Sequence, residues 1–205
     1  MKKFGIRTAG RSLFLCLLAL GFVALAHSEA RADNITFSTT GAFNNASNSI
    51  TFGSGGDTLT LTFSGIGSSN VNASPSTFAS FGTITTSATG SGATVAPGTT
   101  LTINITQTNP SAGSGFVAGS LTGTITQNSS DGQILFTVTS TTINGVLYEV
   151  ANNPLALVPP NTNNGQTTVQ GKITSTVPEP MTMILFGTGL AGIAAKARRR
   201  RKGTD

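Results

Sequence analysis

Few residues of this 205-residue sequence could carry out chemistry, and the acidic ones are the first candidates. Between residues 33 and 176 the carboxylates are those of Asp33, Asp57, Asp131 and Glu149. Two carboxylates that converge on a glycosidic bond can hydrolyse it. However, Asp57 follows two glycines in a loop pattern and Asp131 precedes Gly132 in a turn pattern, so turn roles account for both. We therefore expect no hydrolytic pair.

Nucleophilic and metal chemistry lack their usual side chains in the same region. The single histidine, His27, and the single cysteine, Cys16, both precede residue 33. Their absence from residues 33–176 excludes Ser-His-Asp and Cys-His catalysis there, and zinc lacks its usual histidine and cysteine ligands. Loop aspartates could hold calcium together with Asn152 and Asn153, but no EF-hand spacing is present. We predict a protein that is not an enzyme and has no cofactor and no metal site.

The charge distribution argues against nucleic acid as a partner. The chain has a net charge of +5, but eleven of its twelve basic residues lie within the first 31 positions or from Lys196 onward. Residues 33–176 contain one basic side chain, Lys172, and carry a net charge of −3. Neutralising several phosphates requires several cations. Nucleic-acid binding by this region is therefore excluded.

The N-terminus has the pattern of a secretory signal peptide. Four basic residues in the first 11 positions precede an apolar run at 12–26, followed by small residues. A helix of 15 residues spans about 22 Å, less than the ~30 Å hydrocarbon core of a bilayer. Cleavage could follow Ala26 or the Ala30-Arg31-Ala32 triplet, and we prefer Ala32 because Asp33 then opens the β-patterned region. The signal, residues 1–32, would be handled by the Sec translocon and signal peptidase, and an uncleaved anchor is the alternative.

The C-terminal segment, residues 177–205, has three parts with distinct physical roles. Pro178, Glu179 and Pro180 form an extended stretch that a protease can grip, because proline disfavours helix. An apolar run at 181–195 is predicted to be a helix that partitions into the membrane. A basic tail at 196–202 then stops transfer by staying in the cytoplasm; its charged residues are Lys196, Arg198, Arg199, Arg200, Arg201 and Lys202.

The three parts together resemble the PEP-CTERM sorting signal, which is sometimes labelled an ice-binding-protein C-terminal domain. The resemblance covers about 25 residues, Pro178 to Lys202, and no part of the pattern is missing. It implies recognition by an exosortase, a membrane cysteine protease-transpeptidase of Gram-negative bacteria that also make exopolysaccharide. A plain tail anchor is the alternative, but 15 apolar residues are short for one and it needs no Pro-Glu-Pro.

The apolar run also contains a G-x-G-x-x-G match, Gly187-Thr188-Gly189-Leu190-Ala191-Gly192. A dinucleotide site needs such a match between a strand and a helix. This one lies inside a predicted membrane segment, so close packing of small residues is the better interpretation.

Residues 33–176 are patterned as β-strands. Leu59, Leu61 and Phe63 alternate with threonines, and the same period of two recurs at residues 101–106 and 134–139. Asp131-Gly132 and Asn144-Gly145 favour tight hairpins. The segments 101–107 and 121–127 echo each other, which indicates adjacent strands. We predict one all-β domain, an antiparallel β-sandwich of about 8–10 strands, with a core that contains Phe37, Phe52, Phe63, Phe78, Phe81, Phe116 and Phe136, and with less support Phe43.

Threonine repeats at every second position in three predicted strands, at residues 58–62, 122–126 and 137–141. Such rows could form a flat array that binds polysaccharide or, less favourably, ice, although threonine suits the exposed face of any sheet.

The leading hypothesis is a non-catalytic protein of the cell surface or extracellular matrix, sorted by exosortase and delivered with exopolysaccharide. A polysaccharide-binding module that uses the Thr-rich face is the alternative.

Overall fold

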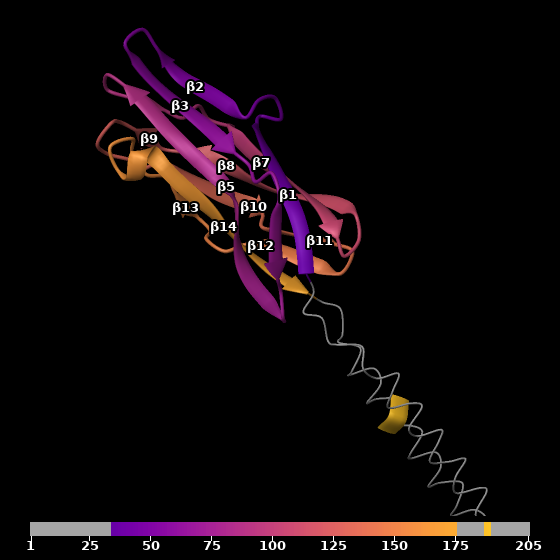
Figure 1. Cartoon of the computed structure of the whole chain (residues 1–205). Helices are drawn as coiled ribbons and strands as arrows, with labels where there is room; N and C mark the ends of the chain where they lie inside the picture. The colour runs from indigo at the N-terminus through magenta and orange to yellow at the C-terminus, as the bar shows by residue number, and fades with distance from the viewer. Residues whose placement is uncertain (1–33, 176–186, 190–205) are drawn as a thin grey trace, which may run out of the picture. The chain divides into compact units, whose positions relative to one another are not determined.

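Threonine alternates with apolar residues in several strands of this chain, because β-branched side chains suit a pleated surface that is buried on one side. The structure, a computed structural model, describes residues 34–175 and 187–189 (Figure 1). One compact unit spans Ala32–Val177. The second unit consists of Met1–Arg31 and Pro178–Asp205, of which only residues 187–189 are described, in helical conformation.

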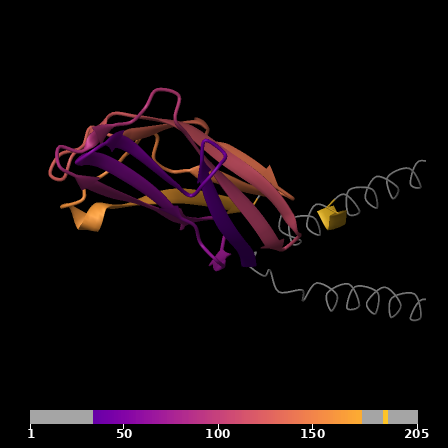
Figure 2. The same cartoon turned by 90° about the horizontal axis from the view of Figure 1, so that it is seen from above.

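Two six-stranded antiparallel sheets face each other in a sandwich-like arrangement (Figures 1 and 2). Sheet A has the order β13 (Leu155–Ala156), β10 (Gln133–Val138), β8 (Gly113–Thr122), β7 (Thr100–Asn109), β1 (Asn34–Phe43) and β4 (Ser69–Asn72). Sheet B has the order β11 (Ser140–Ile143), β12 (Val146–Val150), β14 (Gln166–Ser175), β5 (Ser76–Thr89), β3 (Asp57–Ser64) and β2 (Ser49–Ser54). A small third sheet pairs β6 (Ala93–Thr94) with β9 (Thr124–Ile125), and a 3-10 turn, η1, spans Asn163–Gly165.

The predicted fold class is therefore confirmed at the level of an antiparallel two-sheet sandwich, while the strand count was too low. The described residues contain 14 strands, of which β6, β9 and β13 have two residues each. Strands this short carry no readable period of two. None of the described helical residues belongs to a helix long and apolar enough to cross a membrane.

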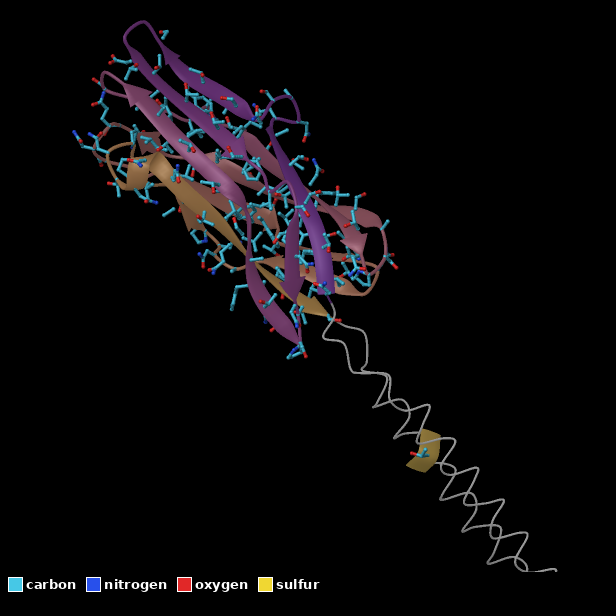
Figure 3. All side chains as sticks on the ribbon, viewed as in Figure 1. Atoms are coloured by element: carbon cyan, nitrogen blue, oxygen red, sulfur yellow. The ribbon has the colours of Figure 1, made fainter. Side chains whose placement is uncertain are left out.

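The core lies between the two sheets, where the inward side chains of both gather (Figure 3). Leu59, Leu61 and Phe63 of β3 are buried as predicted, and so are Leu101, Ile103 and Ile105 of β7. The predicted core phenylalanines that are buried are Phe37, Phe43, Phe52, Phe63, Phe81 and Phe136.

Two predicted core residues were wrong: Phe78 is 61% exposed and Phe116 is 49% exposed. Parity explains both. In a regular strand, residues an odd number of positions apart point to opposite faces. In β5 Phe81 points inward, so Phe78, three residues earlier, points outward. In β8 Val117 points inward, so Phe116 points outward. Val138 was expected to be inward, yet it is 37% exposed because a register shift between Phe136 and Val138 interrupts the alternation.

The turn predictions had mixed outcomes. Asn144 and Gly145 both have positive φ, 46° and 81°, and join β11 to β12 as a tight hairpin. Asp131-Gly132 does not close a hairpin by itself: β10 pairs with residues 118–122 of β8, and residues 123–132, which include β9, connect the two strands. The strand next to β7 is β8, so the echo segment 121–127 is divided between the end of β8 and β9.

Aromatic rings bridge the two sheets at one end of the core. Phe37 of β1 packs edge-on against Phe81 of β5 and Tyr148 of β12, with ring centroids 6.1 Å and 5.7 Å apart. Gly171 of β14 makes room for this cluster, since a Cβ there would lie 2.1 Å from Cζ of Phe81. The glycine is required by a close approach and its φ is ordinary.

Candidate functional site

Each of the three described carboxylates has a neighbour that gives it a role in the fold. Oδ1 of Asp57 accepts a hydrogen bond from the Ser91 amide at 2.7 Å, and Asp131 accepts one from the Thr124 amide. Glu149 of β12 lies opposite Lys172 of β14. Within the described ranges 34–175 and 187–189, no group of three or more His, Cys, Asp or Glu side chains is placed to hold a metal ion.

The two asparagines considered for calcium have different roles. The Asn153 side chain is fully engaged with Phe136 of β10: its Oδ1 accepts from the backbone N–H and its Nδ2 donates to the carbonyl, both at 2.9 Å. Asn153 therefore fastens the loop after β12 to sheet A. The neighbouring Asn152 instead lines an open hollow on sheet B.

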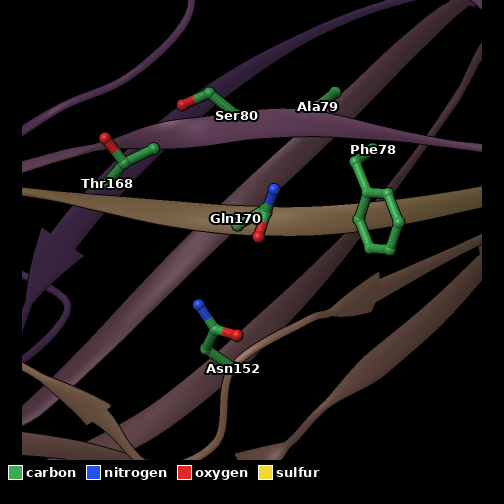
Figure 4. Close-up of a pocket in the computed structure, with 6 residues that line it drawn as sticks. All are labelled: Phe78, Ala79, Ser80, Asn152, Thr168 and Gln170. Carbon is green, nitrogen blue, oxygen red and sulfur yellow. The ribbon is translucent and has the colours of Figure 1, made fainter.

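This hollow is the candidate site, and it has a volume of about 460 Å³. Strands β5 and β14 form its floor, and the loop after β12 contributes Asn152 (Figure 4). Ligand pockets commonly have volumes of about 300–1,000 Å³. The residues that line it are Phe78, Ala79, Ser80, Asn152, Thr168 and Gln170.

A β-bulge in β5 shapes the hollow. Pairing with β14 shifts between Val169 and Gln170, where Gln170 opposes Ser80 and Val169 opposes Gly82. Ser80 Oγ accepts from the Gly82 amide at 3.1 Å, which stabilises the irregular backbone. Because of this bulge the consecutive residues Phe81 and Gly82 are both buried. The residues that face outward are Ser76, Phe78 and Ser80 before the bulge and Thr83 and Thr85 after it.

Cross-strand pairing sets the neighbours of the Phe78 ring. Lys172 lies opposite Phe78 and also opposite Glu149, so an acidic and a basic side chain adjoin on the outer face of sheet B. Gln170 lies two pairs further along, opposite Ser80, and Thr168 opposes Thr83. The ring, the Gln170 amide and the Asn152 amide appear together around the hollow (Figure 4).

A hydroxyl surface extends from the hollow over β5, β3 and β2. Its members pair across strands: the hydroxyls of Thr58 and Thr89 are 2.8 Å apart, those of Thr51 and Thr60 2.9 Å, and those of Ser49 and Thr62 3.0 Å. One of the three predicted threonine rows, Thr58-Thr60-Thr62, thus lies on an exposed sheet face.

The other two predicted rows do not form. Gly123, with φ of 103°, breaks the row at 122–126 between sheet A and the small third sheet. The row at 137–141 is divided between β10 of sheet A and β11 of sheet B. The second and third rows of the actual surface come from β5 and β2.

The residues predicted for export and sorting lie outside the described residues. These are the cleavage triplet with Ala30 and Ala32, the motif Pro178-Glu179-Pro180, and the basic residues Lys196, Arg198, Arg199, Arg200, Arg201 and Lys202. Asp33 lies there too. Of the predicted helix at 181–195, residues 187–189 are described and helical.

Comparison with protein families decides the identity of this segment. The PEP-CTERM protein-sorting motif matches residues 176–201. The chain carries a PEP-CTERM sorting signal. No curated protein and no solved structure matches the chain. The PEP-CTERM match supports exosortase-dependent sorting of an exported protein that is processed at the membrane.

Sequence reasoning missed the hollow as a site. It assigned Phe78 to the core and considered Asn152 only for calcium, and Gln170 was not considered. The parity of Phe78 and Phe81 in one strand was the available signal for the ring. The bulge and the loop that bring the two amides beside it have no sequence signal of comparable strength.

Proposed function

We propose that this protein is a non-catalytic component of the cell surface or extracellular matrix, matured at the cytoplasmic membrane by an exosortase. The observation that carries the proposal is the position of the PEP-CTERM motif relative to the last strand. The motif match begins at residue 176 and β14 ends at Ser175. A cut near Pro178–Pro180 would therefore release the sandwich with every described strand intact.

The N-terminal boundary supports the same reasoning. Strand β1 begins at Asn34 and pairs at once with β4, with Asn34 opposite Asn72. Signal cleavage after Ala32 would leave this pairing complete. Both expected cuts would fall outside the strands, so neither would remove a residue of the sandwich.

Mapping both termini of the protein recovered from the cell surface and medium tests the proposal. We expect a product that begins near Asp33 and ends near Pro178–Pro180, with any attached glycan visible as added mass. A chain that runs through Asp205 and remains in the membrane fraction would mean a tail-anchored domain and would overturn the proposal.

A pair of variants makes the test specific to the sorting motif. Glu179→Ala should retain the full-length C-terminus, because it changes the centre of the Pro-Glu-Pro sequence. Asp205→Asn, beyond the matched residues, should be cut as the unchanged protein is. Equal processing of the two variants would show that the motif does not direct the cut.

Polysaccharide binding is the second candidate function, supported by the hydroxyl surface on sheet B. Ice binding has weaker support, because the paired hydroxyls bond to one another and are less available to order water. Delivery with exopolysaccharide would bring such a surface into contact with its ligand.

A further inference from the structure

The exposed Phe78 ring borders the hollow on sheet B. At 61% exposure it is the most exposed large apolar side chain of the described chain, although it belongs to a strand whose next phenylalanine, Phe81, is fully buried. An isolated exposed apolar residue is ordinary on a protein surface. Here, however, the ring borders a hollow that also contains two amide side chains. An apolar surface with a few convergent polar groups is the general composition of a ligand site.

The two amides have unused hydrogen-bonding capacity. Within the described part of the chain, the side-chain amides of Gln170 and Asn152 form no hydrogen bond with another residue. Each amide has two donor hydrogens and an acceptor oxygen. Sugar hydroxyls are donors and acceptors at once, so an amide can engage neighbouring hydroxyls of one sugar.

The backbone that carries Asn152 is held in place before any ligand arrives. The backbone N–H of Ala151 donates to the Gln170 carbonyl at 2.8 Å, and Asn153 is fastened to Phe136 on the other side. Asn152 is thus flanked by residues tied to β14 and β10. A loop whose backbone is fixed in advance loses little backbone conformational entropy on binding.

Charge selects the class of ligand. The described residues of the sandwich carry three carboxylates and one lysine. The single cation, Lys172, lies beside Phe78 but faces Glu149, so the site has no excess positive charge. An anionic polymer would meet a net negative domain, whereas a neutral one would meet no electrostatic barrier.

We propose that this hollow binds one pyranose unit of a neutral polysaccharide, with the C–H face of the sugar against the Phe78 ring and its hydroxyls bonded to Gln170 and Asn152. The hydroxyl surface on β5, β3 and β2 lies along the same sheet face and would contact neighbouring sugar units. This inference rests on the proposed function in one respect: export must bring the protein to such a polymer.

Affinity electrophoresis of the full chain in mild detergent tests the inference. The probes are three soluble neutral polysaccharides (hydroxyethylcellulose, galactomannan and dextran) and one anionic polysaccharide, alginate. We expect at least one neutral polymer to retard the protein, with little change on adding salt, since no ion pair is involved. Absence of retardation by all three neutral polymers would overturn the inference, as would binding to alginate alone.

Variants then identify the site. Phe78→Ala should weaken retardation roughly tenfold, because the stacking surface is removed. Gln170→Ala should weaken it severalfold, and Phe78→Trp should retain it. Phe116→Ala is the matched control, because Phe116 is a comparably exposed phenylalanine on the outer face of sheet A. Equal loss in Phe78→Ala and Phe116→Ala would refute this site.

The outcome is separable from that of the proposed function. Correct cutting at both termini without binding to any neutral polymer would refute only the inference. Binding by a chain that is never cut would refute only exosortase maturation.

Discussion

The hydroxyl of Tyr148 donates a hydrogen bond of 2.8 Å to Oε1 of Gln107 between the two sheets. Tyr148 belongs to β12 of sheet B and Gln107 to β7 of sheet A, and both are fully buried. Nε2 of Gln107 continues the chain by donating to the carbonyl of Ser111 at 2.8 Å. This one link joins the two sheets to the turn between β7 and β8.

Removing the tyrosine hydroxyl should therefore destabilise the domain. Tyr148→Phe leaves Oε1 of Gln107 buried without a donor, which costs about 1–3 kcal/mol of unfolding free energy. Urea unfolding of the two proteins measures the difference. In a double-mutant cycle with Gln107→Met, the second substitution should cost less in the Tyr148→Phe background. Additive losses would show that the two side chains are not coupled.

Alkaline pH should act through the same residue. Burial raises the pKa of Tyr148 above its ordinary value of 10.0, so the folded protein holds the phenolic proton longer than the unfolded chain does. The stability contributed by the neutral phenol is complete below about pH 10 and is lost as the pH rises further, by at most about 1.4 kcal/mol per pH unit.

Two measurements check this pH dependence. Tyr148 is the only tyrosine and the chain has no tryptophan, so the ultraviolet absorbance of phenolate reports this residue alone. Phenolate should appear together with unfolding, and Tyr148→Phe should lose less stability between about pH 9 and about pH 11. Titration of a folded protein near pH 10 would contradict the burial of the hydroxyl.

The two-sheet fold could be predicted from the sequence because several strands are half-buried and keep a regular period. In β3 the inward residues are aliphatic or aromatic without interruption, and in β7 they are aliphatic up to Ile105, with Gln107 following, so the pattern identified strand and face together. Strand β8 escaped detection because its inward positions include Gly115 and Gly119. A Cβ at Gly119 would lie 2.8 Å from Ile134. The glycine that interrupts the apolar pattern of β8 is therefore required by the packing of β8 against β10.

The candidate site was less predictable, for a physical reason. Its floor depends on the pairing of β5 with β14, two strands separated by more than 75 residues, and on a bulge that sets which residues oppose each other. Long-range pairing is a property of the whole sheet and no short window encodes it. The sorting signal was predictable because its parts are contiguous in the sequence and act largely through composition.

Gly171 should be intolerant of a methyl group. A Cβ at this position would lie 2.1–2.4 Å from three atoms of the Phe81 ring, which is itself packed against Phe37 and Tyr148. We expect Gly171→Ala to lower the unfolding free energy by about 1–3 kcal/mol, as overpacking does. Gly67→Ala is the control, since a Cβ there meets no atom within 4 Å, and thermal unfolding compares the two. Equal melting temperatures would show that the aromatic cluster can shift.

Adjacent asparagines in the loop after β12 should separate stability from binding. Asn153 makes two hydrogen bonds of 2.9 Å to the backbone of Phe136, so Asn153→Ala should cost about 1–3 kcal/mol because it leaves both backbone groups unpaired. Asn152→Ala removes no such bond and should leave urea unfolding unchanged, while it weakens retardation by a neutral polysaccharide. The two substitutions are chemically identical and one residue apart, so a difference between them reflects only what each amide contacts. If Asn152→Ala destabilised the domain as much as Asn153→Ala does, the Asn152 amide would have a structural role. The hollow would then lack one of the two amides proposed to bind the sugar.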